Sequence, residues 1–136
     1  MKLEAVIELE ERIFTTEELL ENLRAKAKAA STSKNDGQPH ATQTTSRVES
    51  LTVKIVATEK ELNELIGQYV TISNELVAEI YRRVTGKAAK VLIARYVMNK
   101  SFGEIATEMN LSASRISRLH RQGRKDYYGQ WSTPPA

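Results

Sequence analysis

The stretch SFGEIATEMNLSASRISRLHRQG, residues 101–123, has the most informative spacing in the chain. Ser101 and Glu104 form an S-x-x-E capping box, in which each side chain accepts a hydrogen bond from the backbone amide of the other, so a helix is predicted to begin here. Asn110 comes at the end of that helix, and asparagine is, after glycine, well suited to a left-handed backbone. Ser112 is then placed to cap a second helix. The stretch therefore predicts two short helices joined by a tight turn.

Apolar residues occupy the faces of these two helices that would meet across the turn: Ile105, Met109, Leu111, Ile116 and Leu119. We expect the helices to cover residues 101–109 and 112 to about 126, after a first short helix over residues 88–98. Two short helices that pack steeply across a tight turn form a helix-turn-helix, whose second helix can enter the DNA major groove. The sequence thus predicts a three-helix domain over residues 86–128 and a loose tail over residues 129–136.

The outward face of the predicted second helix is cationic and rich in serine. Arginine can donate two hydrogen bonds to guanine O6 and N7, so Arg115 and Arg118 are the first candidates for base contacts. Serine hydroxyls, lysines and further arginines suit phosphate oxygens, with Lys87, Lys90 and Arg95 as additional candidates. The predicted DNA-binding residues are Ser112, Ser114, Arg115, Ser117, Arg118, Arg121, Lys100, Arg124 and Lys125.

Charge is divided along the chain. The 136 residues carry a formal net charge of only +3. Residues 1–81 hold nine Lys or Arg against fourteen Asp or Glu, whereas residues 82–126 hold eleven against three. A basic surface kept for solubility would also explain this charge taken alone. Together with the helix-turn-helix pattern, it indicates a module that binds nucleic acid.

Two long helices are predicted before this module. Apolar residues recur at alternating spacings of three and four over residues 3–30 and again over 46–84, which is typical of coiled-coil stripes. Residues 31–47 have no large apolar residue and collect Ser, Thr, Asn, Asp, Gly and Pro, which predicts a flexible connector. The fold class expected is all-α, with an antiparallel helical hairpin or coiled coil over residues 1–84.

A second apolar stripe runs along the later part of the second long helix, at Ile66, Val70, Val77, Ile80 and Val84. One hairpin cannot bury both stripes, so we expect a homo-oligomer, most simply a dimer. The alternative is a monomer that packs this second stripe on its own C-terminal helices.

No catalytic, metal or cofactor site is predicted. The chain has no cysteine, and its two histidines, His40 and His120, have no recognisable partner for acid-base or metal chemistry. Gly86 and Lys87 lack the other residues of a phosphate-binding P-loop. No apolar run reaches the roughly 18 residues of a membrane span, and the acidic start does not resemble a signal peptide. We expect a soluble cytoplasmic protein that is not an enzyme.

The motif resembles the region-four helix-turn-helix of bacterial sigma factors, and in particular that of the ArpU/RinA-like phage transcriptional regulators. The residues that carry the resemblance are Arg95 and Tyr96, then Glu104, Ile105 and Ala106, and then Ser112, Ile116, Arg118, Leu119 and His120. Gly103 and Gly123 depart from the pattern, and Gly123 is expected to weaken the last helix.

The resemblance implies a phage or prophage protein that binds double-stranded DNA and activates late or packaging genes in the host cytoplasm. Two other readings remain open. One is a small terminase-like packaging subunit, which also joins a helix-turn-helix to an oligomerising helical region. The other is a coiled-coil adaptor that contacts RNA polymerase through its acidic helices.

Overall fold

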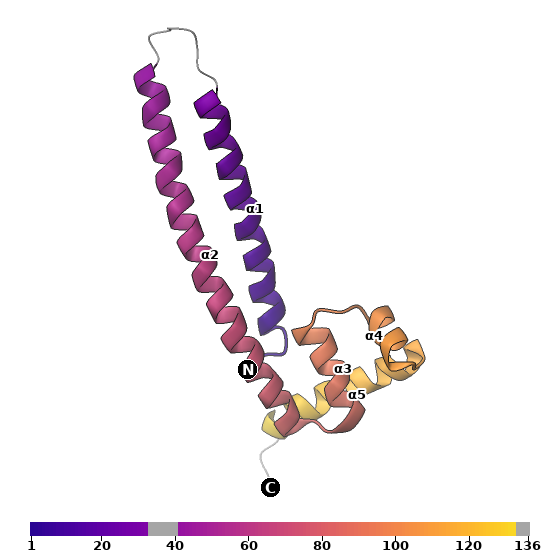
Figure 1. Ribbon diagram of the computed structural model, residues 1–136. Helices are drawn as coiled ribbons and strands as arrows, with labels where there is room; N and C mark the ends of the chain where they lie inside the picture. The colour runs from indigo at the N-terminus through magenta and orange to yellow at the C-terminus, as the bar shows by residue number, and fades with distance from the viewer. Residues whose placement is uncertain (33–40, 133–136) are drawn as a thin grey trace. The chain divides into compact units, whose positions relative to one another are not determined.

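The structure is a computed structural model that describes residues 1–32 and 41–132 (Figure 1). These residues form helices and no strand, which confirms the predicted all-α class. The elements are α1 (Ala5–Thr32), α2 (Ala41–Arg83), α3 (Gly86–Leu92), a π-helical turn η1 (Ile93–Val97), α4 (Phe102–Met109) and α5 (Ala113–Ser132). Residues 33–40 of the predicted connector lie outside the described residues. Its two ends differ from the prediction, because residues 31–32 belong to α1 and residues 41–47 to α2. Both helices extend further into polar sequence than their apolar stripes do.

The chain divides into two compact units. The first, Leu9–Gln68, contains most of α1 and the first part of α2 and is called here the hairpin unit. The second joins Met1–Glu8 to the chain from Tyr69 onwards and is called the helix-turn-helix unit. The first eight residues thus pack with the C-terminal elements, although they come first in the sequence.

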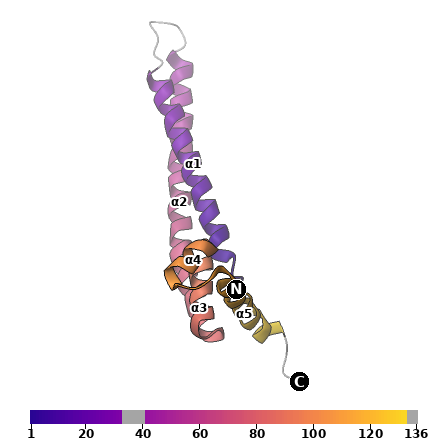
Figure 2. The ribbon, with the colours of Figure 1, turned by 90° about the vertical axis from the view of Figure 1, so that its right-hand side faces the viewer.

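Within the hairpin unit, α1 and α2 lie side by side in both views and run antiparallel (Figures 1 and 2). The buried side chains come from the two predicted stripes: Leu9, Leu20, Leu23, Thr58 and Leu65. The buried Thr58 hydroxyl donates to the Lys54 carbonyl oxygen at 2.7 Å, which satisfies its polar atom. At the exposed edge, Arg24 Nη2 lies 2.9 Å from Glu59 Oε2.

The helix-turn-helix unit has a continuous core around the end of α2, α3 and the end of α5. Its buried members are Leu3, Val6, Leu76, Ile80, Val84, Ala88, Ala89, Leu92, Ile93, Tyr96 and Tyr127. Ile80 and Val84 belong to the predicted second stripe, and they are buried within the chain itself. Ile66 and Val70, from the same stripe, are 43% and 53% exposed. The stripe is therefore used only in part by the chain's own C-terminal helices.

The first short helix differs from the predicted helix over residues 88–98. It begins at Gly86, whose φ of +68° produces the break after α2. Its last turn is π-helical, and the Met98 amide donates to the Ile93 carbonyl oxygen, five residues earlier, at 3.0 Å. Asn99 then takes a left-handed conformation at φ 53°. The apolar spacing over residues 88–98 fits an α-helix and does not distinguish a π turn from an α turn, so the sequence did not predict the π turn.

The last helix is longer than predicted, since α5 continues to Ser132 instead of ending near residue 126. Gly123 does not end it. A Cβ atom at Gly123 would lie 3.0 Å from Leu92 Cγ, so the glycine allows α5 to approach α3 closely. Tyr127 is fully buried and holds the next turn in the core. Residues 129–132 of the predicted tail are thus helical, and 133–136 lie outside the described residues.

Candidate nucleic-acid interface

The tight turn has the geometry that its sequence predicts. Ser101 and Glu104 exchange both hydrogen bonds of the capping box at 3.2 Å. The hydrogen bond that the Ser101 amide donates to the Glu104 carboxylate lowers the pKa of Glu104, and the Ser101 hydroxyl adds to this effect. Asn110 ends α4 in the left-handed region, at φ 56° and ψ 45°. The Ser112 hydroxyl then accepts a hydrogen bond from the Arg115 amide at 3.1 Å and caps α5.

A small apolar core fixes the angle between α4 and α5. Ile105 and Ile116 are fully buried and pack with Val91 of α3. Met109, Leu111 and Leu119 are partly buried against the same cluster. Because α3, α4 and α5 share this core, the first half of α5 is held as a rigid extension of the turn.

The opposite face of that half-helix is open to solvent. The exposed residues are Ser112, Ser114, Arg115, Ser117, Arg118 and Arg121. In the part of the chain that the structure describes, the guanidinium groups of Arg115, Arg118 and Arg121 have no ion-pair or hydrogen-bond partner. Six of the nine predicted DNA-binding residues thus lie on one accessible surface, here called the α5 face.

The other three predicted residues lie elsewhere. Lys125 is exposed. Lys100 is engaged, with its Nζ 2.7 Å from Glu108 Oε2. Arg124 Nη1 lies 2.8 Å from Glu4 Oε1 and 2.7 Å from the Tyr96 hydroxyl oxygen. Lys100 and Arg124 therefore differ from the expectation of free cations, because carboxylates of the same chain neutralise them.

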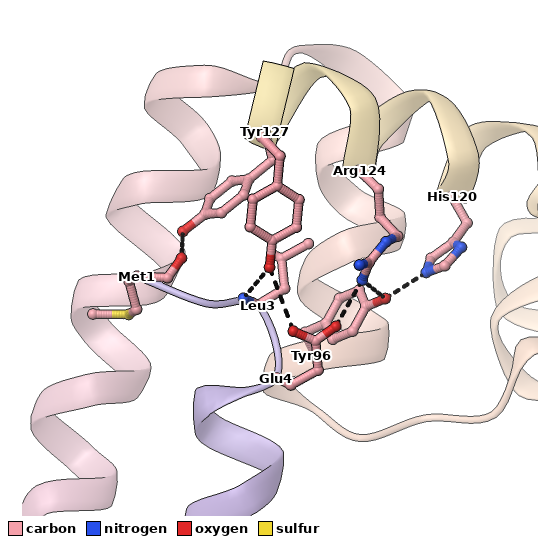
Figure 3. Close-up of polar contacts among 8 residues, drawn as sticks. Met1, Leu3, Glu4, Tyr96, His120, Arg124 and Tyr127 are labelled. Atoms are coloured by element: carbon pink, nitrogen blue, oxygen red, sulfur yellow. Dashed lines mark hydrogen bonds and ion pairs between the residues drawn. The ribbon is translucent and has the colours of Figure 1, made fainter. Parts of the chain in front are cut away.

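Arg124 belongs to a polar network that links α5 to the start of the chain (Figure 3). The Tyr127 hydroxyl donates to the Met1 carbonyl oxygen at 2.6 Å, and the Leu3 amide donates to the Tyr128 hydroxyl oxygen at 2.9 Å. The network continues from Arg124 through the Tyr96 hydroxyl, which lies 2.7 Å from His120 Nε2. No local pattern predicts the contacts between α5 and the first four residues, since they join residues more than 100 positions apart.

The charges of this network are balanced. Burial raises the pKa of Glu4, but the hydrogen bond and charge of Arg124 outweigh it and the net direction is down. Burial, followed by the charges of Arg124 and Arg95, lowers the pKa of His120. His120 also stacks on Tyr96 at 5.6 Å between ring centroids and meets Phe102 edge-on at 4.9 Å. The imidazole is therefore a neutral packing group near pH 7.

Arg95 has a structural partner as well. Its Nη1 donates to the Lys100 carbonyl oxygen at 3.1 Å, and its guanidinium lies 5.0 Å from the Phe102 ring centroid. These contacts hold the loop that leads into α4. Lys87 and Lys90 are exposed, as phosphate contacts require.

A cationic α5 face, a left-handed turn and a shared apolar core together define a helix-turn-helix of the DNA-binding type. Residues 82–126 match the family model "Sigma-70, region 4". The region-4 domain, as these residues are called below, covers about a third of the 136 residues. No significant match was found among curated proteins or solved structures.

The region-4 domain is completed by residues outside its limits. Leu3, Val6 and Tyr127 are fully buried in the same core, although none of them falls within residues 82–126. Burial of a large apolar side chain contributes about 1.5–3 kcal/mol. The N-terminal segment is consequently part of the folded unit that presents the α5 face.

The described ranges show neither a membrane-spanning helix nor a metal site. No helix there is long and apolar enough to cross a membrane. Among residues 1–32 and 41–132, no group of three His, Asp or Glu side chains is arranged to hold a metal ion. His40 lies outside these ranges.

Proposed function

We propose that this chain is a sequence-specific DNA-binding transcription regulator without enzymatic activity, in which α5 enters the major groove. The observation that carries the proposal is the α5 face, where Arg115, Arg118 and Arg121 are exposed and unpaired on a helix with a fixed entry angle. A surface kept only for solubility would not require a capped, rigid turn behind it.

The proposed roles follow from the chemistry of each side chain. Arg115 and Arg118 read guanine edges, and each two-bond contact discriminates by about 1–3 kcal/mol against a wrong base. Ser112, Ser114 and Ser117 bind phosphate oxygens near the helix N-terminus. Arg121 and Lys125 add backbone contacts, whereas Arg124 positions α5 through Glu4 and Tyr96.

The proposal includes a homodimer. A single short reading helix buries too little surface for strong binding, and joining two of them raises the effective concentration of the second. The apolar side chains left exposed on α2 favour a second copy as its partner: Val53, Val56, Ile66 and Val70. Two region-4 domains held together would read paired half-sites.

We further propose that the regulator is phage or prophage encoded and activates late or packaging genes. Support comes from the resemblance of the residues around Tyr96, Ile105 and Arg118 to the ArpU/RinA-like regulators. Footprinting on DNA around the chain's own locus would identify the operator. Light scattering separates regulation from packaging, because a dimer fits a regulator and a ring of many subunits fits a packaging subunit.

The test of DNA reading compares Arg118→Ala with Lys90→Ala in duplex binding. Arg118→Ala should lose preference for the selected sequence, because it removes a base contact. Lys90→Ala should keep the preference and lower the salt dependence of log K by about one unit, because it removes at most one phosphate contact. Equal, sequence-independent losses in both variants would contradict base reading by α5.

A further inference from the structure

The hairpin unit has a charge pattern that the α5 face does not explain. Residues 24–54, around the connection between the two long helices, hold six Lys or Arg against two Asp or Glu. Residues 9–23 and 55–68, the rest of this unit, hold two Lys or Arg against eight Asp or Glu. An acidic pair of helices thus has a basic end.

At this basic end, α1 and α2 form an open surface pocket of about 480 Å³. Three of its lining residues are cations, two are serines and one is apolar: Lys26, Arg47, Lys54, Ser46, Ser50 and Leu51. We call this set the tip pocket. Arg47, Ser50 and Lys54 are three and four residues apart, so they share one face of α2, and Lys26 approaches from α1.

The cations of the tip pocket are accessible. Lys26, Arg47 and Lys54 are all exposed. Within the described residues of this unit, none of them takes part in an ion pair, whereas Arg24 is held by Glu59 at 2.9 Å. Three like charges that line one pocket and form no ion pair repel one another, so an anionic ligand would relieve that repulsion.

We propose that the tip pocket binds the phosphate backbone of DNA, as a second contact independent of sequence. This inference rests on the proposed function, since it assumes that the region-4 domain brings the chain to DNA. Lysine and arginine supply charge, and the hydroxyl groups of Ser46 and Ser50 supply neutral donors that suit phosphate oxygens. The second contact strengthens binding without adding base specificity.

The composition of the pocket favours phosphate over an acidic protein surface. Cores of protein interfaces are enriched in aromatic residues, methionine and arginine and depleted in lysine and serine. The tip pocket has two lysines, two serines, one arginine and one aliphatic residue, and none of its lining residues is aromatic or methionine. The alternative occupant is a second copy of this chain that docks on the tip pocket through its acidic helices, and the experiment below distinguishes it from DNA.

The experiment uses the full chain and two variants of equal charge change. R47Q/K54Q removes two cations of the tip pocket. R12Q/K60Q removes two exposed cations from the acidic part of the same unit. Each is titrated against a duplex of about one half-site and against one of roughly 40 bp, over a range of salt concentrations, with helicity checked by circular dichroism.

On the long duplex, R47Q/K54Q should lower the salt dependence of log K by up to about two units and weaken binding about tenfold near 0.1 M salt. On the short duplex, which offers only the phosphates under the region-4 domain, it should bind like the wild type. R12Q/K60Q should match the wild type on both. In an Arg115→Ala, Arg118→Ala background, the residual binding to long duplex should still depend on Arg47 and Lys54.

Three results would overturn the inference. If R47Q/K54Q had an unchanged salt slope on the long duplex, the tip pocket would not contact DNA, and the proposal that α5 reads the bases would still stand. Equal losses of DNA affinity in R47Q/K54Q and R12Q/K60Q would show that the effect comes from net charge alone. A change in self-association by R47Q/K54Q, with unchanged DNA binding, would assign the pocket to a second copy. If the wild type bound neither duplex, the proposed function itself would fail.

Discussion

Arg124 Nη1 lies 2.8 Å from Glu4 Oε1, although the two residues are 120 positions apart in the chain. The same guanidinium lies 2.7 Å from the Tyr96 hydroxyl oxygen and 5.3 Å from the Tyr128 ring centroid. The start of the chain therefore holds the second half of α5, whose first half carries the proposed reading residues. Arg124, which the sequence predicts to bind DNA, therefore holds α5 in place instead.

Replacing Arg124 should affect stability more than salt dependence. Arg124→Gln loses the pairing with Glu4, the hydrogen bond to Tyr96 and the ring contacts, so we expect a loss of about 1–2 kcal/mol in the free energy of unfolding. Glu4→Gln should cost about 0.5 kcal/mol or less, because the pair is 37% and 40% exposed and is screened by solvent. Urea unfolding measures both.

Lys125→Gln is the matched control, since its side chain is exposed one residue further along α5. It should leave the unfolding free energy unchanged and lower the salt dependence of duplex binding. The opposite assignment, with Arg124→Gln stable and deficient only in DNA binding, would show that Arg124 contacts phosphate.

Gly123→Ala should destabilise the helix-turn-helix unit. Alanine gains up to about 1 kcal/mol of helix propensity over glycine. The new Cβ would lie 3.0 Å from Leu92 Cγ and 3.3 Å from the Ala88 carbonyl oxygen, and Leu92 is fully buried and cannot move freely. We expect a net loss of about 1 kcal/mol, since overpacking costs about 1–3 kcal/mol.

The comparison for this variant is Gly103→Ala, whose Cβ would meet only Ser101 Oγ at 3.9 Å. Gly103→Ala should be neutral or slightly stabilising in thermal unfolding. A Gly123→Ala protein as stable as Gly103→Ala would show that α3 and α5 do not approach as closely as the structure has them.

Replacement of the turn residue Asn110 by glycine should be tolerated, whereas replacement by alanine should be destabilising. At φ 56° and ψ 45° the left-handed conformation costs alanine about 1–2 kcal/mol of conformational free energy, and it costs glycine almost nothing. Asn110→Ala should therefore lower the midpoint of thermal unfolding, and Asn110→Gly should leave it nearly unchanged. A reversed order of the two midpoints would contradict the left-handed turn.

Stability of the helix-turn-helix unit should decrease below about pH 6.5, the usual pKa of histidine in an unfolded chain. Burial and the nearby Arg124 and Arg95 charges lower the pKa of His120 in the folded state, with Glu4 opposing them. The unfolded state consequently binds a proton first as pH falls. The stability due to neutral His120 is complete above pH 6.5 and is lost as pH falls towards the folded pKa.

Unfolding free energies at pH 7.5 and 5.5 test this dependence. Glu4 has a lowered pKa and contributes to the pH dependence only at more acidic values, so this window isolates the histidine. His120→Gln should flatten the dependence, whereas Tyr96→Phe, which keeps the imidazole, should preserve it. An equal decrease in His120→Gln and the wild type would place the titrating group elsewhere.

Local patterns in the sequence were sufficient to predict that the helices form, but not where α2 begins or where α5 ends. They also predicted the capping box, the left-handed Asn110 and the inner positions of Ile105 and Ile116. Each depends on residues within about one turn of one another, so composition and spacing determine them. The outward positions of Arg115 and Arg118 followed from the same helical period.

Only the tertiary structure decided what the remaining residues do. It placed Leu3 and Glu4 against α5, neutralised Arg124 and Lys100, and turned Gly123 from a weak point into a contact with Leu92. Except for the pairing of Lys100 with Glu108, eight positions away, these outcomes depend on contacts between residues far apart in the chain, where no spacing rule operates. A charged residue in a sequence is a candidate for binding, and whether it is free to bind is decided by which carboxylate the fold brings beside it.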